Sequence, residues 1–418
     1  MNKKFYPLRP FQKWIIDRSF HKANSTMMNI GTFFKLNSEI DAEKFIDAIN
    51  KVMESHDIYR CRFVFDPETG EICQHFEGEI FHVQVESWSD EEFNFLKKTF
   101  TEPFMLIDKP MYRIYLFKTQ SANYLYVDFH HSIMDGTALA ILFAREIDMC
   151  YQGKKMRSNP AQYADLIDEE NKISPENLEL ERNFWRNMLK NFGNEKKLPP
   201  PDISEKPAWQ KGEFIYEFKN ISQKFFRETK NKETVFFMAA SMLAISKSAN
   251  VKKSLLTWIH NGRTNSKELR LFGLMIEQLP VALDFSENIS LAELFQTLEN
   301  ETVEGLKNRR GLDYVYDGGF EDGCATFVFQ KKNLDIQNSF KFGGHECKVL
   351  EIQNNLWSAA QNTLDIEVSL TDDEKYFVAL YYDKGIYSEG AMKNFAELMD
   401  KIIFKMQSEN IFLNEIFN

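Results

Sequence analysis

Residues 129–136 read FHHSIMDG and place two adjacent histidines shortly before an Asp-Gly pair. The chain has only eight histidines in 418 residues, so a neighbouring pair calls for an explanation. Before them, NYLYVDFH (123–130) alternates well enough to predict a strand. After them, ALAILFAREI predicts a helix that begins near Gly136. The histidines therefore lie where a strand gives way to a helix, and side chains at such an edge can face a cleft.

The chemistry of this stretch has a functional and a structural interpretation. A neutral imidazole at such an edge can accept a proton or hydrogen-bond an attacking amine. Asp135 could fix the turn by bonding to its own backbone or to a buried cation, and Gly136 would let a substrate approach the main chain closely. Alternatively, His130 and His131 only finish a strand, one buried and one facing solvent, while Asp135 caps a helix. Two adjacent histidines with Asp-Gly at this spacing favour the functional interpretation.

Composition and cysteine use limit the class of protein. The length exceeds that of one hydrophobic core, so two domains or lobes are expected. A net charge of −11 with dispersed Lys and Arg argues against nucleic acid or an anionic membrane as partner. Five cysteines without a C-x-x-C pair favour reduced thiols in a cytoplasmic protein over disulfides or a zinc site. The N-terminus has no apolar h-region of a signal peptide, and no 18-residue apolar run that could span a membrane occurs in the sequence.

Strand and helix patterns occur in both halves of the chain and predict an α/β fold with two similar lobes. Polar and charged residues from 153 to 175, and again KKLPPPDISEKP (196–207), predict the connection between the lobes. We therefore assign residues 1–175 to an N-terminal lobe that carries the histidine pair, and residues 176–418 to a C-terminal lobe. A strand is predicted over residues 59–66 in the first of them.

The stretch FHHSIMDG resembles the HHxxxDG signature of condensation domains of nonribosomal peptide synthetases. That signature is shared with the wider superfamily of chloramphenicol-acetyltransferase-like acyltransferases. Further stretches resemble condensation-domain motifs in the expected order, so the resemblance covers essentially the whole chain. They are YPLRPFQKWII (6–16), SHDIYRCRF (55–63), YADLIDEE (163–170), GRTNSKELRLFGLMIEQLP (262–280) and FVFQ (327–330).

The resemblance implies a V-shaped pseudo-dimer of two chloramphenicol-acetyltransferase-like lobes with a central tunnel between them. A donor thioester would enter the tunnel from one side and an acceptor from the other. His131 would be the catalytic residue, with Gly136 in the same catalytic stretch, and His130 would be structural. No metal is implied, and zinc binding by the pair is disfavoured because adjacent strand residues point to opposite faces.

The resemblance also implies that Asp135 pairs with an arginine. Arg60 is the first choice and Arg263 the second, although Arg60 could instead be an exposed strand arginine. A buried Arg–Asp pair is costly to break from one side, so either substitution should harm folding as much as chemistry.

Two further positions are candidates for substrate binding, Glu277 and Gln330. Glu277 and Gln278 stand where the family usually has Asn and Thr. A carboxylate at position 277 could bind a cationic amine on the acceptor, or it could simply be solvated. Gln330 ends the FVFQ stretch.

The activity implied is the formation of an amide or ester bond in nonribosomal peptide synthesis, a form of secondary metabolism. An acyl, aminoacyl or peptidyl group would pass from a phosphopantetheine thioester to an acceptor amine or alcohol. No cofactor would stay bound, because the phosphopantetheine of a carrier protein, or coenzyme A, is the substrate arm. No activated Ser or Cys is evident, so no covalent acyl-enzyme is expected.

Partners and alternatives follow from the same resemblance. A cytoplasmic monomer would meet carrier proteins of a synthetase and a small amine or alcohol, because no carrier or adenylation stretch is found in the chain itself. It would be a stand-alone enzyme or one domain of a synthetase. The alternatives are a stand-alone coenzyme-A-dependent O- or N-acyltransferase of the same fold, and a non-catalytic scaffold that recruits carrier proteins. Epimerisation is disfavoured by the condensation-like residues 262–280, and heterocyclisation by the intact histidine pair.

Overall fold

The computed structural model shows the chain folded into two compact units. The first unit comprises Met1–Ile173, Asn261–Ile276 and Asn333–Ala359, and the second comprises Ser174–His260, Glu277–Lys332 and Ala360–Asn418. The structure describes residues 3–22, 24–156, 160–192, 198–204, 209–229, 231–318, 324–330, 339–350, 364–371, 373–408 and 411–417.

The first crossing between the units lies at Ile173 and Ser174, close to the boundary expected from the polar residues after 153. The chain then returns twice to the first unit, at Asn261–Ile276 and at Asn333–Ala359, and both segments had been assigned to the C-terminal lobe. The returns have a physical cause, because each segment contributes apolar side chains to the core of the first unit. These side chains are Leu271, Phe272, Met275, Phe342 and Cys347.

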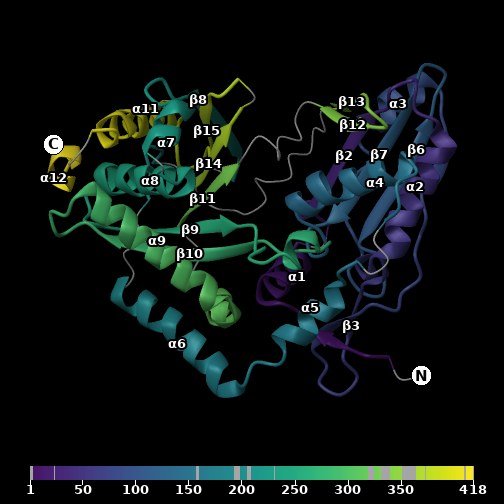
Figure 1. Ribbon diagram of the computed structural model, residues 1–418, viewed down its shortest axis with the longest axis horizontal. Helices are drawn as coiled ribbons and strands as arrows, with labels where there is room; N and C mark the ends of the chain where they lie inside the picture. Colours follow the sequence, from purple (N-terminus) through teal and green to yellow (C-terminus); the bar gives the residue numbers. More distant parts are fainter. Residues whose placement is uncertain are drawn as a thin grey trace. The chain divides into compact units, whose positions relative to one another are not determined.

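The first unit is built on a six-stranded sheet in which β7 is an inner strand (Figure 1). Its strands are antiparallel except for the parallel pair of β5 and β6. Their order is β12 (Ser339–Phe342), β13 (His345–Leu350), β2 (Asn29–Lys35), β7 (Asn123–His130), β6 (Tyr112–Lys118) and β5 (Gln84–Ser87). A second, three-stranded sheet has the order β1 (Tyr6–Pro7), β4 (Ile72–His75) and β3 (Arg62–Phe65).

Side chains of β7 alternate between two apolar cores, as the period of a strand requires. Leu125, Val127 and Phe129 belong to the larger core, whereas Tyr124 and Tyr126 belong to a smaller aromatic cluster on the other face. Helices complete the first unit: α1 (Pro10–His21), α2 (Ala42–Ser55), the 3-10 helix η1 (Asp57–Arg60), α3 (Asp90–Leu96), the π-helix η2 (Ala138–Phe143), α4 (Ala144–Tyr151), α5 (Tyr163–Glu170) and the 3-10 helix η3 (Glu268–Arg270).

The second unit is also a six-stranded sheet with helices (Figure 1). Its strand β11 is parallel to both neighbours, and the remaining pairs are antiparallel. The order is β10 (Glu277–Asp284), β9 (Lys253–His260), β11 (Ala325–Gln330), β14 (Leu364–Leu370), β15 (Tyr376–Asp383) and β8 (Lys211–Glu217). The helices are α6 (Pro175–Phe192), α7 (Gln223–Thr229), α8 (Glu233–Ala249), α9 (Leu291–Lys307), η4 (Arg309–Leu312), α10 (Asp313–Asp317), α11 (Glu389–Met406) and α12 (Leu413–Phe417).

The expected α/β fold of two sheet-and-helix units is confirmed. Two local expectations were wrong. The predicted strand over residues 59–66 begins only at Arg62, because residues 57–60 form the 3-10 turn η1, closed by the Cys61 N–H bonding to the Ile58 carbonyl. The predicted connection over 153–175 contains helix α5, whose first N–H groups, those of Tyr163 and Ala164, both donate to the Asp57 carboxylate. Within the described ranges, the helices are too short or too polar to cross a membrane.

Candidate active site

The histidine pair lies at the end of β7, where the chain turns into helix η2 as the sequence predicted. His130 is the last residue of the strand and is opposite Asn29 of β2. The next N–H, that of His131, donates to the Met28 carbonyl at 2.7 Å. The Ile133 N–H then bonds back to the His130 carbonyl at 3.1 Å, so the main chain of the motif is held by bonds on both sides of the pair.

His131 has the hydrogen-bonding pattern of a proton acceptor. Its Nδ1 lies 2.9 Å from the Met134 carbonyl oxygen. A carbonyl can only accept, so Nδ1 carries the ring proton and Nε2 of the neutral ring has the lone pair. Burial lowers the pKa of His131, against the opposing effects of its own backbone, the Asp135 charge and the Met134 carbonyl. The ring is thus neutral near pH 7, and the residue keeps partial exposure.

His130 is a structural residue by its contacts. It is 2% exposed, and its Nδ1 accepts from the N–H and hydroxyl of Ser132, at 3.3 and 2.7 Å. The proton therefore lies on Nε2, which is 3.1 Å from the Ser19 hydroxyl, and that hydroxyl donates to the Ile15 carbonyl. Burial, with a smaller effect of His131, lowers the pKa of His130 to about 3.

This environment predicts acid sensitivity. Because the pKa of His130 is lower in the folded protein than in the unfolded chain, its contribution to stability is present above about pH 6.5 and is lost as the pH falls toward about 3. We expect the free energy of unfolding of the native protein to fall by about 2 kcal/mol more between pH 7 and pH 5 than that of His130→Gln. Urea unfolding at several pH values measures this difference. The variant His21→Gln, at an exposed histidine, is the control. Equal pH slopes for the native protein and His130→Gln would contradict the prediction.

Asp135 is bound by three donors. Its Oδ1 accepts from the Ala138 N–H at 2.8 Å, and its Oδ2 accepts from Arg263 Nη1 and from the Met275 N–H, both at 2.8 Å. The side chains of Asp135 and Arg263 are both 0% exposed. Asp135 therefore joins the turn after the histidines to the returning segment 261–276.

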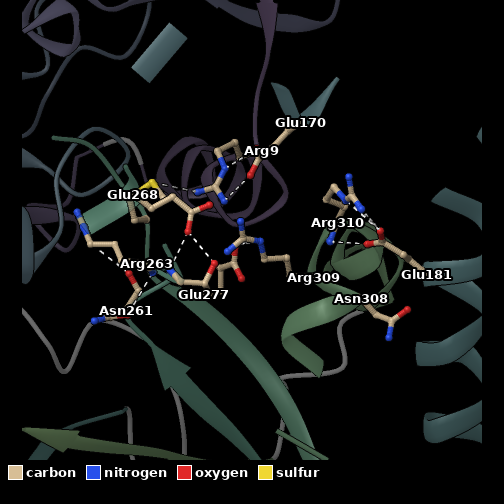
Figure 2. Close-up of polar contacts among 12 residues, drawn as sticks. Arg9, Glu170, Glu181, Asn261, Arg263, Glu268, Glu277, Asn308, Arg309 and Arg310 are labelled. Carbon is tan, nitrogen blue, oxygen red and sulfur yellow. Dashed lines mark hydrogen bonds and ion pairs between the residues drawn. The ribbon is translucent and has the colours of Figure 1, made fainter. Parts of the chain in front are cut away.

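Arg263 is fixed by main-chain carbonyls as well as by Asp135. Its Nη1 also donates to the Asn261 carbonyl at 3.1 Å (Figure 2). Its Nη2 donates to the Leu271 carbonyl at 3.1 Å. The pairing of Asp135 with Arg263, the second choice from the sequence, is confirmed.

The first choice, Arg60, was wrong. It ends the 3-10 turn η1 and is partly exposed, and its Nη1 donates to the Glu54 carbonyl at 3.2 Å. Because η1 ends at Arg60, the buried arginine of SHDIYRCRF is Arg62 and not Arg60. Arg62, the first residue of β3, is buried and donates to the Cys61 and Glu79 carbonyls.

The remaining candidates have distinct surroundings. Gly136 is partly exposed, and a Cβ atom added there would meet nothing within 4 Å. The close approach of a substrate stays a prediction. In the second unit, Glu277 begins β10 and is 5% exposed, so its interpretation as a solvated side chain was wrong. Its Oε1 lies 4.0 Å from Nε of Arg309 (Figure 2). Gln330 ends β11 opposite Ser369, and its role also stays a prediction.

Sequence reasoning missed a partly buried ion pair in the first unit. Arg9 Nε and Nη2 donate to the two oxygens of Glu170, at 2.8 and 3.0 Å (Figure 2). The only sequence signal was a charged residue inside the apolar opening stretch YPLRPF. Among the described residues, no group of three or more His, Cys, Asp or Glu is placed to hold a metal ion.

Comparison with known proteins finds a matching family model and curated relatives. A family model described as "Condensation domain" matches residues 2–409. Bacitracin synthase 2 of Bacillus licheniformis is 24% identical over 361 residues, which are 81% of this chain and 14% of that protein. Surfactin synthase subunit 2 of Bacillus subtilis (strain 168) is 23% identical over 313 residues, 73% of this chain and 9% of that protein. The chain thus spans a small part of the curated relatives it matches.

Solved structures share the fold. The condensation domain from Monacolin K polyketide synthase has a TM-score of 0.77 at 17% identity, covering 98% of this chain and 99% of that one. The starter condensation domain of rhizomide synthetase has a TM-score of 0.76 at 15% identity, covering 97% of each chain. The epimerization domain from the third module of tyrocidine synthetase B has a TM-score of 0.72 at 18% identity, covering 100% of this chain and 98% of that one.

Proposed function

Because the chain belongs to the condensation domain family, we propose that it transfers an acyl group from a thioester to an acceptor amine or alcohol. The observation that carries this proposal is the state of His131. Its Nδ1–H is engaged by the Met134 carbonyl, so the neutral ring carries its lone pair on Nε2, and the residue is partly exposed. Asp135 and Arg263 support the turn that carries it.

The transfer step balances without a covalent enzyme intermediate. The amine nitrogen attacks the thioester carbonyl carbon, and the C–N bond forms as the carbonyl becomes an oxyanion. His131 Nε2 takes the proton that the nitrogen loses. The C–S bond then breaks, the carbonyl reforms, and the thiolate leaves with a proton returned from His131. An alcohol acceptor follows the same course and forms an ester.

The donor thioester is proposed to be the phosphopantetheine arm of a carrier protein. Support comes from the relatives, which are named as synthases and are many times longer than this chain. In this proposal the arm is a substrate, and Glu277 and Gln330 take part in binding the acceptor or donor. Coenzyme A is the alternative carrier of the same arm.

A donor and acceptor panel tests the proposal. The chain is mixed with one acyl group carried either on a phosphopantetheinylated carrier protein or on coenzyme A, together with amines and alcohols. Mass spectrometry identifies the product, and a thiol reagent measures released thiol. We expect an amide or ester to form with the carrier-bound donor.

The other outcomes each assign a different function. Turnover with coenzyme A alone would indicate a coenzyme-A-dependent acyltransferase. Deuterium entering the α-carbon of an aminoacyl donor without condensation would indicate an epimerase. Carrier binding without turnover for any donor and acceptor would indicate a scaffold, and would overturn the proposed catalytic role.

A further inference from the structure

One peptide group in the first unit is hydrogen-bonded at both ends, and it is the peptide between Leu274 and Met275. Its carbonyl oxygen accepts from the Tyr163 hydroxyl at 2.8 Å and from Arg9 Nη1 at 3.0 Å. Its N–H donates to Asp135 Oδ2 at 2.8 Å. Two side chains from distant parts of the sequence therefore contact Asp135 through a single planar group.

Two glycines allow close packing around Leu274 and Met275. Gly273 has φ +142°, and a side chain there would begin 2.3 Å from the ring of Tyr163. Gly262 has φ +65°, and a side chain there would begin 1.5 Å from the Met275 carbonyl oxygen. Any other residue would strain the backbone. A side chain at Gly273 would displace the tyrosine, and one at Gly262 would displace the Met275 carbonyl, which belongs to the next peptide.

The two donors are themselves held in place. Arg9 is buried, and two of its nitrogens each donate a hydrogen bond to the Glu170 carboxylate. This pair of hydrogen bonds fixes the plane of the guanidinium, and Nη1 donates to the Leu274 carbonyl. Tyr163 is fully buried at the first residue of α5. Burial raises the pKa of Tyr163, so its hydroxyl keeps the proton that it donates.

Donation to a carbonyl oxygen polarises the peptide and makes its N–H a stronger donor. The acceptor of that N–H, Asp135, also closes the turn to Ala138, and the carbonyl of the preceding residue, Met134, holds His131 Nδ1. The bonds thus form a continuous series from Arg9 and Tyr163 to the catalytic ring.

We infer that Tyr163 and Arg9 are positioning residues for His131, because they hold and polarise the Leu274–Met275 peptide that fixes Asp135. The effect on turnover rests on the proposed function, whereas the effect on the peptide does not. The bonds of Tyr163 and Arg9 to the peptide lie within the first unit, so the inference can be tested on the intact chain by a signal from Met275 itself.

The test compares native protein with Tyr163→Phe, which removes one hydroxyl and leaves the ring against Gly273. Backbone amides are labelled with [15N]methionine, and the Met275 signal is assigned by its loss in Met275→Leu. Loss of one hydrogen bond should speed exchange of the Met275 amide about five- to tenfold. With a donor thioester and an acceptor that the native protein converts, kcat of Tyr163→Phe should fall about tenfold while KM stays unchanged. This is the pattern expected when a catalytic group is misplaced.

Tyr387→Phe is the matched control. Tyr387 is a buried tyrosine of the second unit whose hydroxyl donates to the Pro199 carbonyl at 2.7 Å. The Tyr387→Phe variant should lose about as much stability as Tyr163→Phe, while the exchange rate of the Met275 amide and kcat stay at their native values. Arg9→Lys, which cannot reproduce the paired bonds to Glu170, should act in the same direction as Tyr163→Phe.

The outcomes separate the inference from the proposed function. A Met275 amide that exchanges equally in native protein and Tyr163→Phe, or that responds equally to Tyr387→Phe, overturns the inference. A Met275 response specific to Tyr163→Phe supports it, even if the native protein shows no turnover and the proposed function fails.

Discussion

Replacing His131 with alanine is expected to lower kcat about 10²- to 10⁴-fold, the range of effect for loss of a general base. The variant lacks the Nε2 lone pair that receives the acceptor's proton, while the bonds that hold Asp135 are unaffected. Single-turnover consumption of the donor thioester, followed by mass spectrometry, measures the change. Donor binding should persist, because the imidazole acts on the acceptor.

The pH dependence of the native protein is a second measure of the same group. A general base works when it is deprotonated, so kcat should fall on the acid side as His131 becomes protonated. Since burial lowers the pKa of this ring, the fall should lie below the ordinary histidine range. If His131→Ala retains native kcat with the best donor and acceptor, His131 is not the base and the transfer step must be reassigned.

The local pattern of the sequence was sufficient to predict the strand and turn that carry the histidines. The strand predicted over 123–130 coincides with β7, because the side chains alternate between two apolar cores and the alternation is visible in NYLYVDFH. The helix after Gly136 was also predicted, although its first turns are the π-helix η2. The periodicity of apolar residues predicts a helix, but it does not distinguish a π-helix from an α-helix.

The partner of Asp135 could not be predicted in the same way. It lies 128 residues along the chain, in a segment that returns from the second half of the sequence to the first unit. No local pattern encodes such a return, and the resemblance of SHDIYRCRF to a family motif made Arg60 the first choice. Arg60 failed because residues 57–60 form a turn in place of the expected strand.

Arg9 and Tyr163 illustrate the same limit for positioning residues. Both belong to stretches that the sequence analysis quoted, but their bonds to Leu274 span 265 and 111 residues. A resemblance assigns roles to residues that match a motif. The positioning roles of Arg9 and Tyr163 depend instead on contacts between residues that lie far apart in the sequence.

Breaking the buried pair of Asp135 and Arg263 from one side is expected to destabilise the protein by about 3–5 kcal/mol. In Arg263→Met, the Asp135 carboxylate stays buried without its cation, and the Leu271 and Asn261 carbonyls lose a donor. In Asp135→Asn, the guanidinium is the uncompensated charge. Urea unfolding of the native protein, both single variants and the double variant measures each cost.

The double variant decides whether the cost belongs to the pair or to each residue separately. Because the charges compensate one another, Asp135→Asn with Arg263→Met should be less destabilised than the sum of the two single variants. Lys51→Ala is the matched control, since it breaks an exposed ion pair with Asp47 at 2.6 Å, and exposed pairs contribute little. Additive costs in the double variant, or an Arg263→Met loss no larger than that of Lys51→Ala, would show that the pair does not hold the turn of His131.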